Sequence, residues 1–338
     1  MPFRRSCFCS SSPAGRRATS ACGGSPVLDA LFQASILTSV AAATIRISTP
    51  LLLAALGELV AERSGVYNMG LEGMMLMGAF TGYLAAYESG SLWLGVLAAG
   101  LTGALMALVF AVLVITLKVE QIVTGLAVNL LGAGLSTYWL RSAFAGDGKT
   151  PTIPFFADVP VPGLSDIPAL GPILFDQRVL TYVAYLMVPA VWLFLFRTRY
   201  GLIVRCAGDN PKALDVKGVK VAPVQYAAVV FGGLMAGLAG AFLSVGQAAR
   251  FVPDMTNGRG WLAIIIVIAG LWRPYPILVA ALVFSFLDAL QLQIQGVGIA
   301  IPYQYMLMMP YVAAIVALMI SRSRTSAPAM LGVPYTRE

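Results

Sequence analysis

The sequence predicts an all-α membrane protein with about ten transmembrane helices, and two observations lead to that class. Of the 338 residues, 59% are hydrophobic and only 11% are charged, whereas about a quarter of the residues in a soluble domain are charged. Runs of about 20 apolar residues, long enough to cross a bilayer as helices, recur along the chain. One large membrane domain therefore accounts for most of the length, and no room remains for a separate soluble catalytic domain.

Ten apolar segments follow one another along the chain. They lie roughly at residues 27–45, 50–62, 66–87, 92–117, 121–141, 178–197, 224–246, 260–272, 275–295 and 303–321. Most approach full spanning length, but 50–62 and 260–272 contain only about 13 residues, which is typical of half-helices and of packed interior helices. The expected transmembrane domain occupies residues 27–321.

Loop charges predict how these segments are oriented. The Ser-, Gly- and Arg-rich residues 1–26, which we expect to form a disordered tail, are basic, as are the loop 198–223 and the tail 322–338. The loop 142–177 is acidic and rich in proline. Because cytoplasmic loops are enriched in Lys and Arg, the first three should be cytoplasmic and the last extracytoplasmic. Ten crossings satisfy this pattern as two inverted halves, with short or broken helices near the midplane.

The residue inventory excludes several kinds of chemistry. The chain has no histidine, which removes Ser-His and Cys-His pairs and His-ligated metals, and its four cysteines lack the spacing of a metal site. Residues 146–150 end like a phosphate-binding loop, but Ala143 replaces the required glycine and no helix is expected to follow. We therefore expect no enzyme, no cofactor and no metal. The net charge of +7 reflects cytoplasmic loops and not nucleic-acid binding.

Residues 57–82 are the most informative run, because charged and polar side chains interrupt a mostly apolar stretch. These side chains are Glu58, Glu62, Arg63, Asn68 and Glu72. Lipid penalises buried charge and exposed backbone, so their position predicts a protein-lined polar site, and hence transport. We expect a break at residues 64–65 and a second helix with Asn68 as its N-cap, with Glu72 one turn further on the same face. The alternative for Glu62 and Arg63 is a solvated cytoplasmic interface.

Further polar side chains occur inside the later apolar segments. Asn129 lies mid-span in 121–141, where it either lines a substrate path or makes an interhelical hydrogen bond. Asp288, Gln291 and Gln295 share one helical face, which predicts a water-facing stripe. The predicted substrate pathway comprises Asn68, Glu72, Asn129, Tyr138, Gln247, Asn257 and Gln291.

The basic loop 198–223 contains a predicted two-turn helix. Asn210 is a favourable N-cap, Pro211 suits the first helical position, and Gly218 suits the C-terminal stop. Such a helix is either an ordinary solvated element or a docking element for a cytoplasmic partner. The predicted coupling residues are Gly208, Asp209, Asn210, Pro211, Lys212, Ala213, Asp215 and Gly218.

Three runs, in this order and spacing, carry a resemblance to a known family. They are GELVAERSG followed by NMGLEGMM within 57–75, AGDNPKA at 207–213, and GRGWLA at 258–263. Together they resemble ATP-binding cassette importer permeases of the ribose and branched-chain amino acid group, and the first run is most similar to the nucleoside and simple-sugar permease subunits. The resemblance covers about residues 30–321. The chain departs from the pattern at Tyr67 and Asp209, where a small apolar residue and Glu are expected, and in its long tail at 1–26.

The resemblance implies a mechanism and a set of partners. A second permease subunit completes the pathway, an extracytoplasmic lipoprotein delivers the substrate, and cytoplasmic ATP-binding subunits grip the coupling helix. It further implies a multi-pass protein of the bacterial plasma membrane with both termini in the cytoplasm. The residues leave one alternative open, a cation-coupled secondary transporter in which Glu72 or Asp288 would be an ion ligand.

Overall fold

The computed structural model describes residues 34–144, 151–154, 156–160, 171–296, 303–321 and 327–335. Residues Thr38–Glu338 group into one compact unit, and of the smaller unit, Met1–Leu37, only the first turn of one helix is described. The predicted tail at 1–26 therefore lies outside the described residues.

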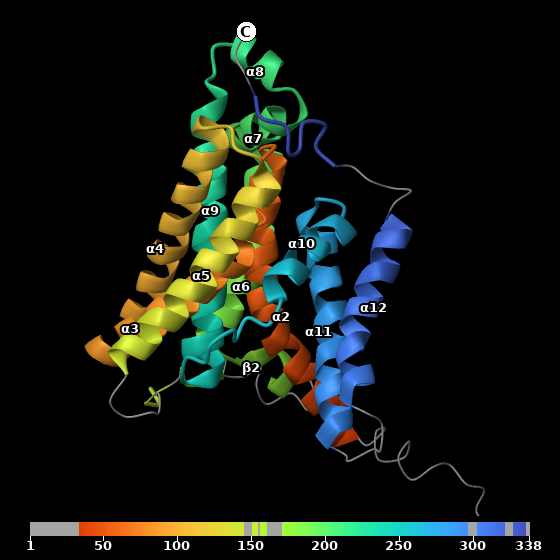
Figure 1. The fold of residues 1–338 in the computed structure, drawn as a ribbon. Helices are drawn as coiled ribbons and strands as arrows, with labels where there is room; N and C mark the ends of the chain where they lie inside the picture. Colours follow the sequence, from red (N-terminus) through yellow and green to blue (C-terminus); the bar gives the residue numbers. More distant parts are fainter. Residues whose placement is uncertain are drawn as a thin grey trace, which may run out of the picture. The chain divides into compact units, whose positions relative to one another are not determined.

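The described residues are predominantly α-helical (Figure 1). In chain order the helices are α2 (Ala34–Arg63), α3 (Leu71–Ser89), α4 (Leu92–Ala111), α5 (Gln121–Ala143), α6 (Val179–Arg197), α7 (Arg199–Asp209), α8 (Pro211–Val216), α9 (Val221–Ala241), α10 (Arg259–Ala269), α11 (Pro274–Gly296) and α12 (Tyr303–Ser321). Short π-helical segments extend α4 as η1 (Val112–Thr116) and α9 as η3 (Phe242–Ala248), and η2 (Gly171–Phe175) precedes α6. Two short antiparallel strands, β1 (Val159–Pro160) and β2 (Asp176–Gln177), pair with each other.

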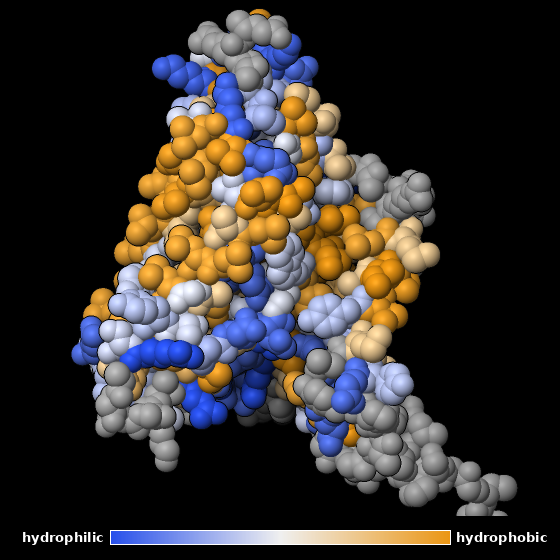
Figure 2. All heavy atoms as spheres, in the orientation of Figure 1, coloured by the Kyte–Doolittle hydropathy of each residue, from blue (hydrophilic) through white to orange (hydrophobic). Residues whose placement is uncertain are grey.

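Six helical stretches are long and apolar enough to cross a membrane, counted over the described residues alone. They are Thr38–Arg63, Leu92–Thr116, Gln121–Ala143, Val179–Arg197, Val221–Ala248 and Pro274–Gln295. Hydrophobic residues cover the visible faces of α4 and α5 over most of their length, and hydrophilic residues gather toward the ends (Figure 2). The predicted class, an all-α multi-pass membrane protein, is confirmed.

The first predicted pair of segments differs from the structure. The sequence divides this region into 27–45 and 50–62, but residues 34–63 form the single helix α2. Pro50 lies inside α2 and removes the N–H that would bond to the carbonyl of Arg46. The side chain of Gln247 replaces that donor, with its Nε2 3.3 Å from the Arg46 oxygen. Because a distant residue satisfies the freed carbonyl, the proline does not end the helix, and ten separate crossings are not confirmed.

Close backbone contacts hold α3, α4 and α9 together. A Cβ atom added at Gly78 of α3 would lie 2.6 Å from the Cα atom of Gly237 on α9. One turn before Gly237, Gly233 of α9 faces Gly103 of α4. Small residues of this kind let helices approach closely where lipid removes the hydrophobic drive for association. These three helices therefore form a rigid group on which α5 packs through α3.

A second group consists of α10, α11 and α12, which contact one another. The helix α10 has only 11 residues and runs beside α11 for part of its length (Figure 1). The short predicted segment 260–272 is thus confirmed as a short helix. The contact between α10 and α3 joins the two groups, and the candidate site lies at that junction.

Candidate functional site

The turn between α2 and α3 forms where the sequence predicts a break. The helix α2 ends at Arg63, and Gly65 adopts a positive φ of 91°. The N-cap of α3 is Gly70, not Asn68 as predicted. The Asn68 Oδ1 atom instead accepts a hydrogen bond from Gly70 N at 3.1 Å, the local bond of an Asx-turn. This turn postpones the start of α3 to Leu71.

The charged side chains at the end of α2 are buried. Glu58 and Glu62 have no exposed surface, and Arg63 is 9% exposed, so the solvated alternative for Glu62 and Arg63 is wrong. Asn68 N donates to Glu58 Oε1 at 2.9 Å. The indole N–H of Trp272 donates to Glu62, and Arg63 donates twice to the Trp272 carbonyl, at 3.1 and 2.7 Å. These bonds tie α2 to the turn that follows α10.

Glu72 holds the first turn of α10. Gly258 N donates to Glu72 Oε1 at 2.9 Å, and Gly260 N donates to Oε2 at 2.6 Å. The first N–H groups of a helix lack helical partners and carry partial positive charge, so a carboxylate stabilises this end. A Cβ atom at Gly260 would lie 2.7 Å from the Glu72 Cα atom, so only glycine permits this approach. Glu72 therefore fixes α10 on α3.

Asn129 of α5 makes a matching contact with the start of α3. Its Oδ1 atom accepts from Gly73 N at 2.8 Å, and its Nδ2 atom donates to the Met69 carbonyl at 2.8 Å. Both functions of one amide are used across the helix interface. The structure thus places Asn129 in the interhelical hydrogen bond that the sequence left as its alternative.

A polar cavity of about 190 Å³ lies between α10, α11 and α12. Its lining residues are Asn257, Arg259, Leu262, Asp288, Gln291, Leu292, Gln295, Pro310 and Tyr311. The predicted polar stripe on α11 therefore faces a cavity. Gln291 is 4% exposed, and the Gln295 Nε2 atom is buried without a hydrogen-bond partner among the described residues. The cavity thus contains polar groups that are able to bond to a solute.

The structure brings together only part of the predicted pathway. Asn257 and Gln291 line the polar cavity. Asn68 is fully buried, and Tyr138 is 66% exposed on α5. Gln247 is bonded to the Arg46 carbonyl of α2. The role of the seven residues in a substrate path stays a prediction.

Two polar cavity residues, Arg259 and Tyr311, were missed as site residues by the sequence reasoning. Arg259 lies inside the GRGWLA run, which was used only as a family motif, so a signal for it existed. Tyr311 lies in an apolar stretch of α12 in which no periodic pattern of polar residues marks one face. Only the packing of α12 on α10 reveals that it lines the cavity.

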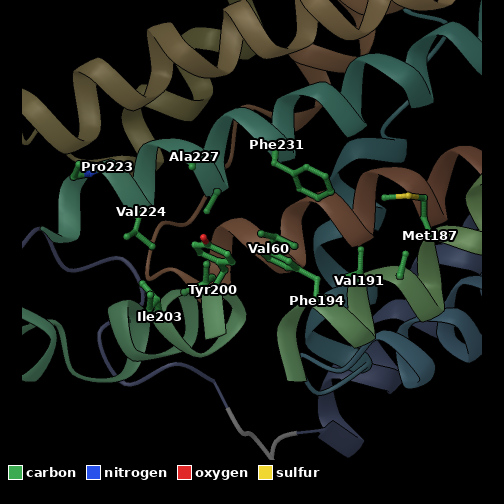
Figure 3. Close-up of a pocket in the computed structure, with 13 residues that line it drawn as sticks. Val60, Met187, Val191, Phe194, Tyr200, Ile203, Pro223, Val224, Ala227 and Phe231 are labelled. Atoms are coloured by element: carbon green, nitrogen blue, oxygen red, sulfur yellow. The ribbon is translucent and has the colours of Figure 1, made fainter. Parts of the chain in front are cut away.

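A larger cavity of about 590 Å³ between α2, α6, α7 and α9 is apolar (Figure 3). Among its 13 lining residues only Tyr200 carries a hydroxyl group, and Val60, Phe194 and Phe231 present aliphatic or aromatic surface. Such a lining offers almost no hydrogen bonds to a polar solute. The smaller polar cavity is therefore the better candidate site.

The predicted coupling helix is present as α8, at the end of the bundle opposite β2 (Figure 1). Asn210 is its N-cap and accepts from Ala213 N at 3.1 Å, Pro211 is its first residue, and Gly218 has a φ of 81°. The structure adds an 11-residue helix, α7, where the sequence predicted only a loop. Thr198 caps α7 by accepting from Gly201 N, a signal that the sequence contained.

The C-terminal segment 327–335 packs against this end of the protein. Met330 N donates to the Gly208 carbonyl at 2.9 Å. Two residues later, Gly332 N donates to the Gly65 carbonyl at 3.1 Å. The segment therefore bonds both to the end of α7 and to the turn that precedes α3.

Comparison with known proteins identifies the family. Residues 40–321 match the family described as "Branched-chain amino acid transport system / permease component". The chain is 42% identical over 265 residues to a putative glucose ABC transporter permease of Haloferax volcanii (77% of this chain, 78% of the relative). It is 37% identical over 312 residues to a guanosine ABC transporter permease of Bacillus subtilis (89% and 98%), and 32% identical over 300 residues to a nucleoside ABC transporter permease of Lactococcus lactis (86% and 94%).

No solved structure matches the chain significantly. The family match covers most of the chain, including the α2–α3 turn, the helix α8 and the polar cavity. Members of this family are membrane components of transporters and not enzymes. The chain belongs to the family of branched-chain amino acid transport system permease components.

Proposed function

We propose that the chain is the permease subunit of an ATP-binding cassette importer for a nucleoside or a simple sugar. The observation that carries this proposal is the similarity over almost the whole length of relatives named for guanosine and nucleoside transport. A relative named for glucose supports the inclusion of sugars. Both kinds of solute are neutral and rich in hydroxyl groups, which suits a polar cavity lined by amides.

The proposed partners are cytoplasmic ATP-binding subunits, a second permease subunit and an extracytoplasmic substrate-binding lipoprotein. The sequence offers no complete nucleotide-binding motif of its own, so an energy source has to act through another chain. We place the complex in the bacterial plasma membrane. The basic loop that contains α7 and α8 marks the cytoplasmic side, and the C-terminal segment 327–335 lies on that side. A cytoplasmic N-terminus and two inverted halves stay predictions from the loop charges.

A chain of contacts is available to carry movement from α8 to α10. Gly208, just before α8, lies so close to Gly65 that a Cβ atom on Gly208 would be 2.9 Å from Gly65 N. Two residues before that turn, Arg63 donates to the Trp272 carbonyl, and Glu62 accepts from its indole. Trp272 lies three residues after Ala269, the last residue of α10. We propose that the ATPase moves α7 and α8, and that this junction passes the motion to α10.

Replacing residues 210–218 by a flexible Gly-Ser linker of equal length is expected to abolish ATP-driven uptake by the assembled importer. The linker removes the cap, the proline and the helix that a partner would grip, whereas the membrane helices keep their contacts. Uptake of radiolabelled guanosine and glucose into cells that express the full complex is the measurement.

The matched control inserts a Gly-Ser pair after Gly90 in the turn between α3 and α4, so that Gly90 keeps the positive φ of 66° that favours glycine. This variant should transport normally. Transport that survives in the 210–218 variant, with the ATPase still hydrolysing ATP, would show that α8 is not the coupling element.

A further inference from the structure

The polar cavity between α10, α11 and α12 contains a carboxylate that has no ion pair within the described chain. Asp288 is half-buried, and no described cation lies within 4.0 Å of it, although Arg259 lines the same cavity. Arg259 acts on Asp288 electrostatically, but neither it nor any other described cation lies within ion-pair distance, and a carboxylate at membrane depth without a direct donor is costly. On the cavity wall, the Asp288 carboxylate is open to hydrogen bonds from a bound molecule.

The amides around Asp288 are similarly uncommitted. Gln291 lines the cavity, and only 4% of its surface is exposed. It makes no hydrogen bond within the part of the chain that the structure describes. The Gln295 Nε2 atom is buried and unpartnered there. One turn of α11 separates Gln291 from both Asp288 and Gln295, so the three polar groups form one wall. An acceptor-only carboxylate lies beside amides that both donate and accept.

The charges of the cavity favour a neutral solute over an ion. Arg259 and Asp288 contribute opposite formal charges, so the lining carries no net charge to attract an anion or a cation. The described residues contain no group of three acidic, Cys or His side chains that would hold a metal ion. The ion-ligand role that the secondary-transporter alternative gives to Asp288 therefore finds no support in this geometry.

The volume of the cavity sets the size of the bound group. Drug-sized ligands occupy pockets of about 300–1,000 Å³, and this cavity measures about 190 Å³. It holds a single ring, not a whole nucleoside. The part that a nucleoside shares with a simple sugar is one ring with hydroxyl groups on adjacent carbons. Two adjacent hydroxyls donate naturally to the two oxygens of one carboxylate.

We propose that this cavity binds the sugar ring of the transported solute, with Asp288 accepting hydrogen bonds from two adjacent hydroxyl groups and Gln291 and Gln295 bonding to the rest of the ring. This inference rests on the proposed function. It adds the chemical group of the solute that the cavity recognises, which is a pair of hydroxyl groups on adjacent carbons (a vicinal diol).

Binding to the purified full-length chain in detergent tests this proposal without the lipoprotein, whose own specificity would mask the effect. The probes are guanosine, glucose and 2′-deoxyguanosine, which lacks one hydroxyl of the diol. Guanosine and glucose should bind saturably, and 2′-deoxyguanosine at least about tenfold more weakly, since a hydrogen bond to a charged group is lost. Asp288→Asn should weaken guanosine binding to the level of 2′-deoxyguanosine.

Two variants serve as controls for folding and for the chemical change. Asp254→Asn makes the same substitution at an exposed residue outside the cavity and should bind like the unchanged chain. Gln291→Leu breaks no hydrogen bond of the described chain, so it should remain folded while all saturable binding weakens. Equal binding of guanosine and 2′-deoxyguanosine, or no saturable binding of any probe, overturns the proposal.

The failure of this inference is separable from that of the proposed function. ATP-dependent uptake of guanosine or glucose by the complete importer, with no diol discrimination by the purified chain, would refute the cavity assignment alone. A complete importer that takes up neither solute would refute the proposed function itself.

Discussion

Replacing Glu72 by alanine is expected to detach α10 from α3 and to lower the thermal stability of the purified protein. The substitution leaves the N–H groups of Gly258 and Gly260 without their acceptor. A buried donor that loses its partner costs about 1–3 kcal/mol, and the helix terminus also loses a favourable charge. Glu72→Gln should be intermediate, because it keeps one carbonyl oxygen but loses the charge. Thermal unfolding in detergent gives the ranking.

Glu88→Ala is the matched control for this series. Glu88 lies on the same helix and is exposed. Within the described residues, its side chain makes no hydrogen bond to the end of another helix. Its replacement should change the midpoint temperature little. Equal stability of Glu72→Ala and Glu88→Ala would mean that the two short hydrogen bonds do not hold α10.

Gly237→Val should prevent formation of the packed group of α3, α4 and α9. A Cβ atom at Gly237 would overlap the carbonyl oxygen of Ala99 on α4. The helix α3 is equally near, because a Cβ atom at Gly78 would lie 2.6 Å from the Gly237 Cα atom. Overpacking of a close-packed core typically costs about 1–3 kcal/mol, and backbone atoms on two sides leave no route for relaxation. We expect little monodisperse protein after detergent extraction, as measured by size-exclusion chromatography.

Gly134→Val gives the corresponding control in α5. A Cβ atom at Gly134 would meet nothing within 4 Å, so the added side chain projects outward and should be tolerated. If both glycine variants yield the same amount of folded protein, the close approach at Gly237 does not determine the packing.

Local signals allowed some elements to be predicted from the sequence. The helix α8 carries its own cap, proline and terminal glycine, so Asn210, Pro211 and Gly218 define it without tertiary help. The break after α2 and the short length of α10 follow equally from short-range composition. The polar stripe on α11 required only the helical period, and it faces the cavity.

Other features depend on partners that are distant in the sequence. The apolar pattern separated residues 27–45 from 50–62, but Gln247, almost 200 residues later, bonds to the carbonyl that Pro50 leaves free inside the continuous helix α2. Glu72 was expected on a substrate path because a charge at membrane depth needs a partner. That partner is the backbone of α10, which composition does not reveal. The packing of residues 327–335 on Gly65 and Gly208 likewise has no local sequence signal.

Bonds from Glu62 and Arg63 connect the first motif, residues 57–75, to Trp272, which lies on the far side of α10 from the later motif, residues 258–263. The carboxylate and the guanidinium at the end of α2 both bond to Trp272, three residues after the last residue of α10. Glu72 of the same first motif bonds to the other end of α10. The first run therefore holds both ends of the short helix that the later run begins, and this helix carries Arg259 into the polar cavity.

The most direct test of the account is concentrative flux into proteoliposomes. The permease subunits are reconstituted with or without the ATP-binding subunits, with the lipoprotein and radiolabelled guanosine or glucose supplied on the outside and ATP enclosed. Accumulation against a gradient is expected only when the ATP-binding subunits and ATP are both present. Accumulation by this chain alone, driven by an imposed sodium or proton gradient, would contradict a permease that depends on an ATPase.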